Sequence, residues 1–193
     1  MLLLSLALAC APNPDASTSG SGGDPDECAW EAPTNTWPAS TPPGCPEAEG
    51  FRPGQVVPDM RLMDQHGDTV SLWQFHGDLV LLDFSSMWTT QMWPEELATV
   101  GAEHAGAGIM SVSVLVEDTV GDVPDQDELL DWAAHTGAVG PVLADTDDVY
   151  FTAVSDQPIW PYVLLIDREL RVIEDGLLWQ EPGQIRESVE DHL

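Results

Sequence analysis

Apolar and polar residues form short blocks from about residue 51 onward, and the period of each block predicts a type of element. The run Leu79–Phe84 (LVLLDF) is apolar except for one aspartate, which is typical of a strand covered on both faces. Ile109–Val116 has the same character and predicts a second buried strand. Further strands are predicted at Val56–Met63 and Thr69–Leu72, which flank the turn His66-Gly67-Asp68 as a hairpin, and at Val142–Ala144, Tyr162–Asp167 and Arg171–Glu174.

Four segments carry helix signals. Trp93–His104 has Pro94 and two acids in its first turn, where the missing hydrogen-bond donor and the helix dipole favour them. Asp127–Thr136 is amphipathic and ends before Gly137. Shorter helices are predicted near Asp148–Val154 and at Gly183–His192. This order predicts an α/β fold with a central mixed β-sheet, helices on both of its faces and an N-terminal β-hairpin extension.

The first fifty residues differ in composition from the rest. Residues 1–9 (MLLLSLALA) are short and apolar and precede Cys10, so they resemble a bacterial lipoprotein signal peptide in which Cys10 becomes lipidated. An ordinary cleaved signal peptide is the alternative. Residues 10–27 hold mostly Pro, Ser, Gly and Asp and predict a flexible tether. Residues 28–50 predict an extension that packs Trp30 and Trp37 onto a globular domain at 51–193.

The charge of the chain is strongly one-sided. Thirty-four acids against five arginines give a formal net charge of −29, with no lysine. Such a surface repels phosphate, which excludes a nucleic-acid partner, and it repels anionic membrane surfaces. Membrane attachment therefore has to come from the lipid anchor. The acidity itself suits solubility in a salty habitat, and a cationic partner or metal ions are the alternatives.

The three cysteines have two different predicted roles. With Cys10 assigned to lipidation, Cys28 and Cys45 remain as a pair, and in an exported protein the default interpretation is a structural disulfide. A redox role for the pair is the alternative, although no basic residue near it lowers the pKa of either thiol. Together these signals predict a location in the bacterial cell envelope, facing the periplasm or in the outer membrane.

Two motifs add a resemblance to a known family. The stretch GQVVPDMRLMDQHGDTVSLWQFHGDLVLLDFSSMW and the later WPYVLLIDRELRVI resemble the thioredoxin-like proteins of the TlpA and redoxin type. The similarity covers about residues 51–193 and implies a thioredoxin-like fold. It also implies thiol–disulfide oxidoreductase activity, which in the family depends on a Trp-Cys-x-x-Cys motif.

The resemblance places that motif on Trp88-Thr89-Thr90-Gln91-Met92. Thr89 stands at the attacking cysteine and Met92 at the resolving one, and neither side chain forms a disulfide. No catalytic residue is therefore expected. The family's buried carboxylate corresponds to Asp83, its helix acid to Glu95 and its cis-proline to Pro161, and structural roles explain Asp83 and Glu95 without catalysis.

The same two segments supply a candidate binding surface for an extended polypeptide. It consists of Trp88, Trp93, Trp160, Pro161 and Tyr162, with Met87 and Met92 beside them. The alternative is that these side chains fill the space of the lost redox machinery. The remaining tryptophans, Trp73, Trp132 and Trp179, are predicted in the core. The acids at 145–148 lack the glycine and glutamate of a calcium loop and suit a helix cap, so no metal and no cofactor is expected.

These observations favour a redox-degenerate, thioredoxin-like envelope lipoprotein that binds a polypeptide or has a structural role. The alternative is a thiol–disulfide oxidoreductase or antioxidant protein, as family membership implies, which would have to use Cys28 and Cys45. The oligomeric state is left open.

Overall fold

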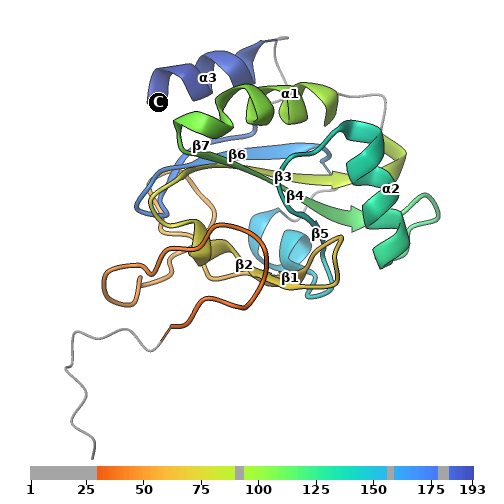
Figure 1. The fold of residues 1–193 in the computed structure, drawn as a ribbon, viewed down its shortest axis with the longest axis horizontal. Helices are drawn as coiled ribbons and strands as arrows, with labels where there is room; N and C mark the ends of the chain where they lie inside the picture. The colour runs from red at the N-terminus through yellow and green to blue at the C-terminus, as the bar shows by residue number, and fades with distance from the viewer. Residues whose placement is uncertain (1–29, 90–93, 156–158, 178–182) are drawn as a thin grey trace, which may run out of the picture.

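The computed structural model describes residues 30–89, 94–155, 159–177 and 183–193. Its centre is a five-stranded mixed sheet in the order β5-β4-β3-β6-β7 (Figure 1). The strands are β3 (Leu79–Ser86), β4 (Ile109–Glu117), β5 (Val142–Ala144), β6 (Tyr162–Ile166) and β7 (Val172–Asp175). Strand β3 runs parallel to β4 and antiparallel to β6, and all its residues are buried because it is the central strand.

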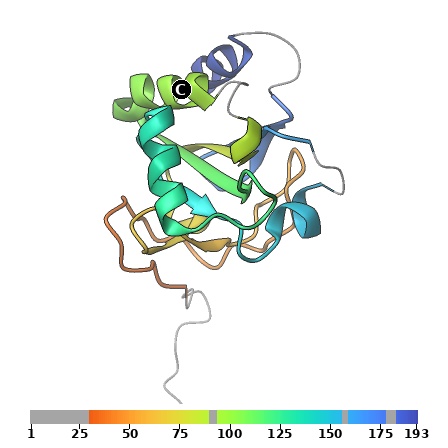
Figure 2. The same ribbon diagram turned by 90° about the vertical axis from the view of Figure 1, so that its right-hand side faces the viewer.

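One face of the sheet carries the three α-helices. These are α1 (Pro94–His104), α2 (Gln126–Thr136) and α3 (Gln184–His192). Leu79 and Leu81 of β3 point toward α1 and α3, where they pack with apolar side chains of both helices. Helix α2 covers β4 and β5 on the same face through Leu129 and Trp132. Figure 2 shows α1 and α3 on one side of the sheet, with α2 beside α1.

The opposite face is covered by shorter elements. They are the hairpin β1 (Arg61–Met63) and β2 (Thr69–Ser71), the 3₁₀ turn η1 (Leu72–Phe75) and the π-helical turn η4 (Tyr150–Val154). Val80, Leu82 and Phe84 of β3 point into this second layer, since successive side chains of a strand alternate between faces. The largest apolar cluster lies here. Helical segments thus flank both faces of the mixed sheet, as expected.

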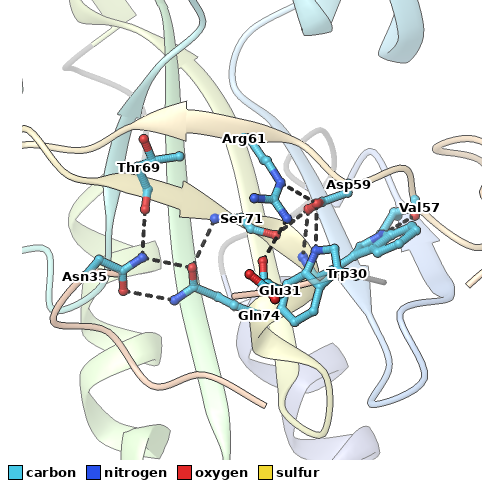
Figure 3. Close-up of polar contacts among 10 residues, drawn as sticks. Trp30, Glu31, Asn35, Val57, Asp59, Arg61, Thr69, Ser71 and Gln74 are labelled. Atoms are coloured by element: carbon cyan, nitrogen blue, oxygen red, sulfur yellow. Dashed lines mark hydrogen bonds and ion pairs between the residues drawn. The ribbon is translucent and has the colours of Figure 1, made fainter. Parts of the chain in front are cut away.

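The segment from Trp30 to Gly50 lies along this second layer. The indole N–H of Trp30 donates to Asp59 Oδ2 at 2.8 Å (Figure 3). The indole N–H of Trp37 donates to Asp64 Oδ2 at 2.6 Å, and both rings are partly buried against the core. The predicted packing of this extension onto the domain is therefore confirmed for its two tryptophans.

Most of the predicted elements are present, and two differ. Val56 is not part of the hairpin: it forms an isolated bridge with Arg171, and the hairpin pairing begins only at Arg61. Pro58 lies between the two, and a proline has no N–H for a strand ladder. The second difference is η4, which is a five-residue π-helical turn where a helix near Asp148–Val154 was predicted. Asp148 has a φ of 53° and so does not belong to a right-handed helix, and the Asp145 carboxylate accepts the backbone N–H groups of Val149 and Tyr150 where the turn begins.

The predicted core tryptophans Trp73 and Trp132 are buried, and Trp179 lies outside the described residues. No helix in the described parts of the chain is both long enough and apolar enough to cross a membrane. Cys45 is disulfide-bonded. Its predicted partner Cys28 lies outside the described residues, as does Cys10, so the pairing and the lipidation stay predictions.

Candidate functional site

The predicted site lies where β3 ends. After Ser86 the chain forms the 3₁₀ turn η2 (Met87–Thr89), and α1 begins at Pro94. Thr89 is therefore the last described residue before the helix, and Glu95 lies in its first turn. Met92 and Trp93 lie outside the described residues. In the sequence, the positions between β3 and α1 hold threonine, glutamine, methionine and tryptophan, and no cysteine.

Asp83 lies below this turn on β3, and its side chain points to the face that carries α1. It is 2% exposed, and the Ser85 hydroxyl is its hydrogen-bond partner, with Oγ 2.9 Å from Oδ1 and 2.8 Å from Oδ2. Burial raises the pKa of Asp83 to about 7, and the hydrogen bond from Ser85 opposes that shift. The carboxyl group can therefore hold or release a proton near neutral pH.

Among the described residues of the predicted surface, Trp88 is the exposed one. Its side chain is 53% exposed, and its indole N–H donates to Glu117 Oε2 at 3.1 Å at the end of the neighbouring strand β4. Its ring meets the ring of Trp160 edge-on, with centroids 5.5 Å apart and planes at 87°. The prediction that Trp88 and Trp160 lie side by side is therefore confirmed, although they are 72 positions apart in the chain.

Trp160 itself is buried. It is 7% exposed and contacts Tyr150 and Phe151 of η4, at centroid distances of 5.6 and 5.7 Å. The Trp160–Pro161 peptide bond is cis, the geometry that the resemblance implies at Pro161. In the described part of the chain, the buried indole nitrogen of Trp160 has no hydrogen-bond partner.

Tyr162 is not part of an exposed surface either. It is 8% exposed, and its hydroxyl donates to Asp175 Oδ2 at 3.0 Å and accepts from the Arg52 guanidinium at 3.3 Å. Burial and the neighbouring Asp175 carboxylate raise the pKa of Tyr162 to about 12, so the phenol stays neutral. The prediction that Trp160, Pro161 and Tyr162 form an exposed surface is therefore wrong. All three are buried, with Tyr150 of η4 against both aromatic rings and Arg52 against the Tyr162 hydroxyl.

Comparison with known proteins gives the fold. No family model and no curated protein matches the chain. Among solved structures, it is similar to a thiol:disulfide interchange protein from Bacteroides sp., with a TM-score of 0.58 and 20% identity over 73% of this chain and 90% of that one. It is also similar to the thioredoxin domain of a thiol-disulfide oxidoreductase from Bacteroides vulgatus, with a TM-score of 0.59 and 19% identity over 74% of this chain and 98% of that one. A third match is a thioredoxin family thiol:disulfide interchange protein from Chlorobium tepidum, with a TM-score of 0.58 and 15% identity over 73% and 97% of the two chains. This chain has a thioredoxin-like fold.

Sequence reasoning missed three residues of the site in this thioredoxin-like domain. Phe151 is 37% exposed and packs against Trp160, and Tyr150 lies fully buried beneath both rings. Glu117 fixes Trp88 from the neighbouring strand. The only sequence signal for them was the adjacent aromatic pair at 150–151, because neither that pair nor Glu117 belongs to a motif.

A shallow hollow of about 300 Å³ lies beside η4 and is lined by Arg52, Phe151, Thr152, Ala153, Val154 and Ser155. Arg52 is held there by Asp175, with N and O atoms 3.7 Å apart. Within the described ranges, no three His, Cys, Asp or Glu side chains are grouped so that they could hold a metal ion. Asp145 uses its carboxylate to accept backbone N–H groups at the start of η4, as a helix cap does.

Proposed function

We propose that this chain is a bacterial cell-envelope protein that keeps a thioredoxin-like fold, performs no disulfide exchange at the usual position and binds a polypeptide there. One observation carries the proposal: Thr89 and Met92 stand between β3 and α1, where a thioredoxin-like oxidoreductase has its two cysteines. Exchange requires a thiolate as the attacking group and a second thiol to resolve the mixed disulfide. A hydroxyl and a thioether provide neither.

The surroundings of the position support binding over redox chemistry. Asp83 remains buried beneath η2 with a raised pKa, yet the sequence between β3 and α1 supplies no thiol to which it could pass a proton. Trp88 and Phe151 remain exposed beside the position. Exposed aromatic side chains contribute most of the binding energy in many protein interfaces. The site therefore retains an exposed aromatic surface and lacks the thiol sulfur atoms that disulfide exchange requires.

The envelope location rests on separate support. Residues 1–9 resemble a lipoprotein signal peptide ahead of Cys10. Cys45 is disulfide-bonded, and disulfides persist mainly in oxidising compartments such as the periplasm. We propose that a lipid on Cys10 anchors the chain, with residues 11–27 as the tether to the domain. Replacement of Cys10 by serine is then expected to move the protein from the membrane fraction to the soluble fraction of its native cells.

An insulin-reduction assay with dithiothreitol as the electron source tests the chemical part of the proposal. The full chain is expected to show no rate above the uncatalysed background. The double variant Thr89→Cys/Met92→Cys restores the thiol pair and is the matched positive control, since it changes only the two reacting positions. A gain of turnover in that variant, with none in the parent, supports the proposal. Turnover by the parent overturns it.

The second candidate function is an oxidoreductase that uses Cys28 and Cys45, and the favouring observation is that the similar structures are thiol-disulfide proteins. Against it, the extension that carries Cys45 lies on the hairpin side of the domain, away from the end of β3 in Figure 1. Thiol titration against a redox buffer distinguishes the two. A pair that cycles near about −200 mV favours the oxidoreductase, and a pair that stays oxidised favours a structural disulfide.

A further inference from the structure

Three aromatic rings beside the end of β3 pack against one another in a row, here called the aromatic platform, which consists of Trp88, Trp160 and Phe151. Trp160 lies between the other two and meets each ring edge-on, with centroids 5.5 Å from Trp88 and 5.7 Å from Phe151. Trp88 is 53% and Phe151 37% exposed, while Trp160 is almost fully buried. The two outer rings are thus held from below by a buried one and present their surfaces to solvent.

The edge of the aromatic platform is acidic. Glu117 accepts the indole N–H of Trp88 and thereby lies against that ring. The next residue, Asp118, accepts the backbone N–H groups of Asp122, Val120 and Gly121, and these hydrogen bonds lower the pKa of its carboxyl group, so it carries a full negative charge at neutral pH.

The single cation described at this site does not offset these charges. Arg52 lines the hollow beside Phe151, but its guanidinium is already engaged by Asp175 and by the Tyr162 hydroxyl. The chain as a whole has a formal net charge of −29. An aromatic ring attracts a cation through its π face, by about 0.5 to 2 kcal/mol depending on desolvation. The exposed ring of Trp88, with the Glu117 carboxylate against it, is therefore complementary to a cationic side chain.

We propose that the aromatic platform binds a basic segment of a polypeptide, with a lysine or arginine side chain over Trp88 and its charge against Glu117. This inference rests on the proposed function, because it takes the surface as one for binding and not for thiol exchange. It adds the chemistry of the partner, which is cationic.

Titration of the purified full chain with short synthetic peptides tests the proposal, with calorimetry as the readout. Three peptides of equal length are compared, in which the same positions hold lysine, glutamine or glutamate. We expect binding of the lysine peptide only, weakened by added salt because the contact is between charges near the surface. Equal binding of the glutamine peptide overturns the proposal, and so does the absence of binding by the lysine peptide.

Variants of the platform locate the contact. Trp88→Leu keeps an apolar side chain but removes the π face and the indole N–H, and Glu117→Gln removes one charge. Each is expected to raise the Kd for the lysine peptide, by on the order of tenfold for Trp88→Leu and several-fold for Glu117→Gln. Asp191→Asn, at the far end of α3, removes the same charge from an exposed position and is expected to leave the Kd unchanged.

Equal weakening by Asp191→Asn and Glu117→Gln shows that bulk charge alone attracts the peptide and overturns the proposal. Circular dichroism of each variant verifies that the fold is intact, and Trp88 is exposed enough for the leucine variant to fold. The insulin assay is independent of these titrations. A chain that reduces insulin contradicts the proposed function, whereas a redox-silent chain that ignores the lysine peptide contradicts only this inference.

Discussion

The hydroxyl of Ser85 lies within hydrogen-bond distance of both carboxylate oxygens of Asp83, two residues earlier on the same face of β3. Among the described residues, this hydroxyl is the hydrogen-bond partner of the Asp83 side chain, which is 2% exposed. A single neutral donor does not compensate the loss of hydration on burial, and the pKa of Asp83 therefore rises from 3.8 to about 7.

The first prediction concerns pH. Because the folded state binds this proton more tightly than the unfolded chain, the free energy of unfolding falls as the pH rises from about 4 to about 7. Each unit of pKa shift corresponds to about 1.4 kcal/mol, so the loss amounts to roughly 4 kcal/mol. Asp83→Asn removes this titration. The variant is expected to gain stability relative to the parent as the pH increases, measured by urea unfolding at acidic and mildly alkaline pH.

The comparison between parent and variant matters here, because the other acids of the chain contribute to the pH dependence of both proteins equally. Parallel stability curves for the two proteins would contradict the assignment of a raised pKa to Asp83.

The second prediction concerns the contact between the extension and the hairpin. Asp59 accepts hydrogen bonds from Trp30 Nε1 and Arg61 Nε, both at 2.8 Å, and from the Ser71 hydroxyl (Figure 3). Asp59→Ala leaves these donors without their acceptor, and we expect a loss of about 2–4 kcal/mol in the free energy of unfolding. Arg61→Ala removes an exposed ion pair with Asp59, a hydrogen bond to the Glu31 carbonyl and a cation–π contact with Trp30, and is expected to cost about 1 kcal/mol because the side chain is exposed. Equal losses in the two variants contradict this difference.

The third prediction concerns a close approach of two backbones. A Cβ atom at Gly140 would lie 1.8 Å from the backbone oxygen of Ser111 on β4, and backbone cannot move aside as a side chain can. Gly140→Ala is therefore expected to destabilise the fold by several kcal/mol or to displace the loop before β5. Gly106 has open space around it and its φ lies outside the left-handed region, so Gly106→Ala is the matched control with little effect. Thermal unfolding followed by circular dichroism measures both.

The fourth prediction concerns the support of the aromatic platform. The Tyr150 hydroxyl donates to the Ile159 carbonyl at 2.7 Å, which ties η4 to the segment before Trp160. Tyr150→Phe keeps the ring and removes this bond and the weaker one that the hydroxyl accepts from the Ile159 N–H at 3.3 Å, at an expected cost of about 1–2 kcal/mol. Tyr150→Ala also empties the space beneath Trp160 and is expected to cost about 3–5 kcal/mol. Near-ultraviolet circular dichroism should change much more in the alanine variant, and similar spectra for the two would argue against a supporting role for the ring.

Local signals predicted the fold well where one segment decides its own structure. The continuous apolar run of β3 predicts a strand buried on both faces, and β3 is the central strand. Local residues determine both ends of helix α2. Asp125 and Glu128 form a capping box at its start, and Gly137 adopts the left-handed conformation at its end. The hairpin was placed by its Gly67 turn, although its first strand is shorter than predicted.

The failures have a common cause in contacts between distant segments. Val56 pairs with Arg171 and not within the hairpin, and no local pattern encodes that partner. Trp160 and Tyr162 were predicted to lie on a surface with Trp88, yet η4 and Arg52 cover them. An aromatic side chain can either bind a partner or pack in the core. Which of the two occurs depends on whether other parts of the fold cover the ring.

The sequence by itself determined the chemistry that is missing: whether Thr89 or Met92 can form a thiolate depends on the identity of the side chain alone, in any conformation. Tertiary structure alone decided which aromatic rings face solvent and how far burial raises the pKa of Asp83. Burial is a property of the assembled chain. Trp88 is exposed and contacts Glu117, which is 29 positions away in the chain. Trp160 is buried, and Tyr150 of the separate element η4 packs against it.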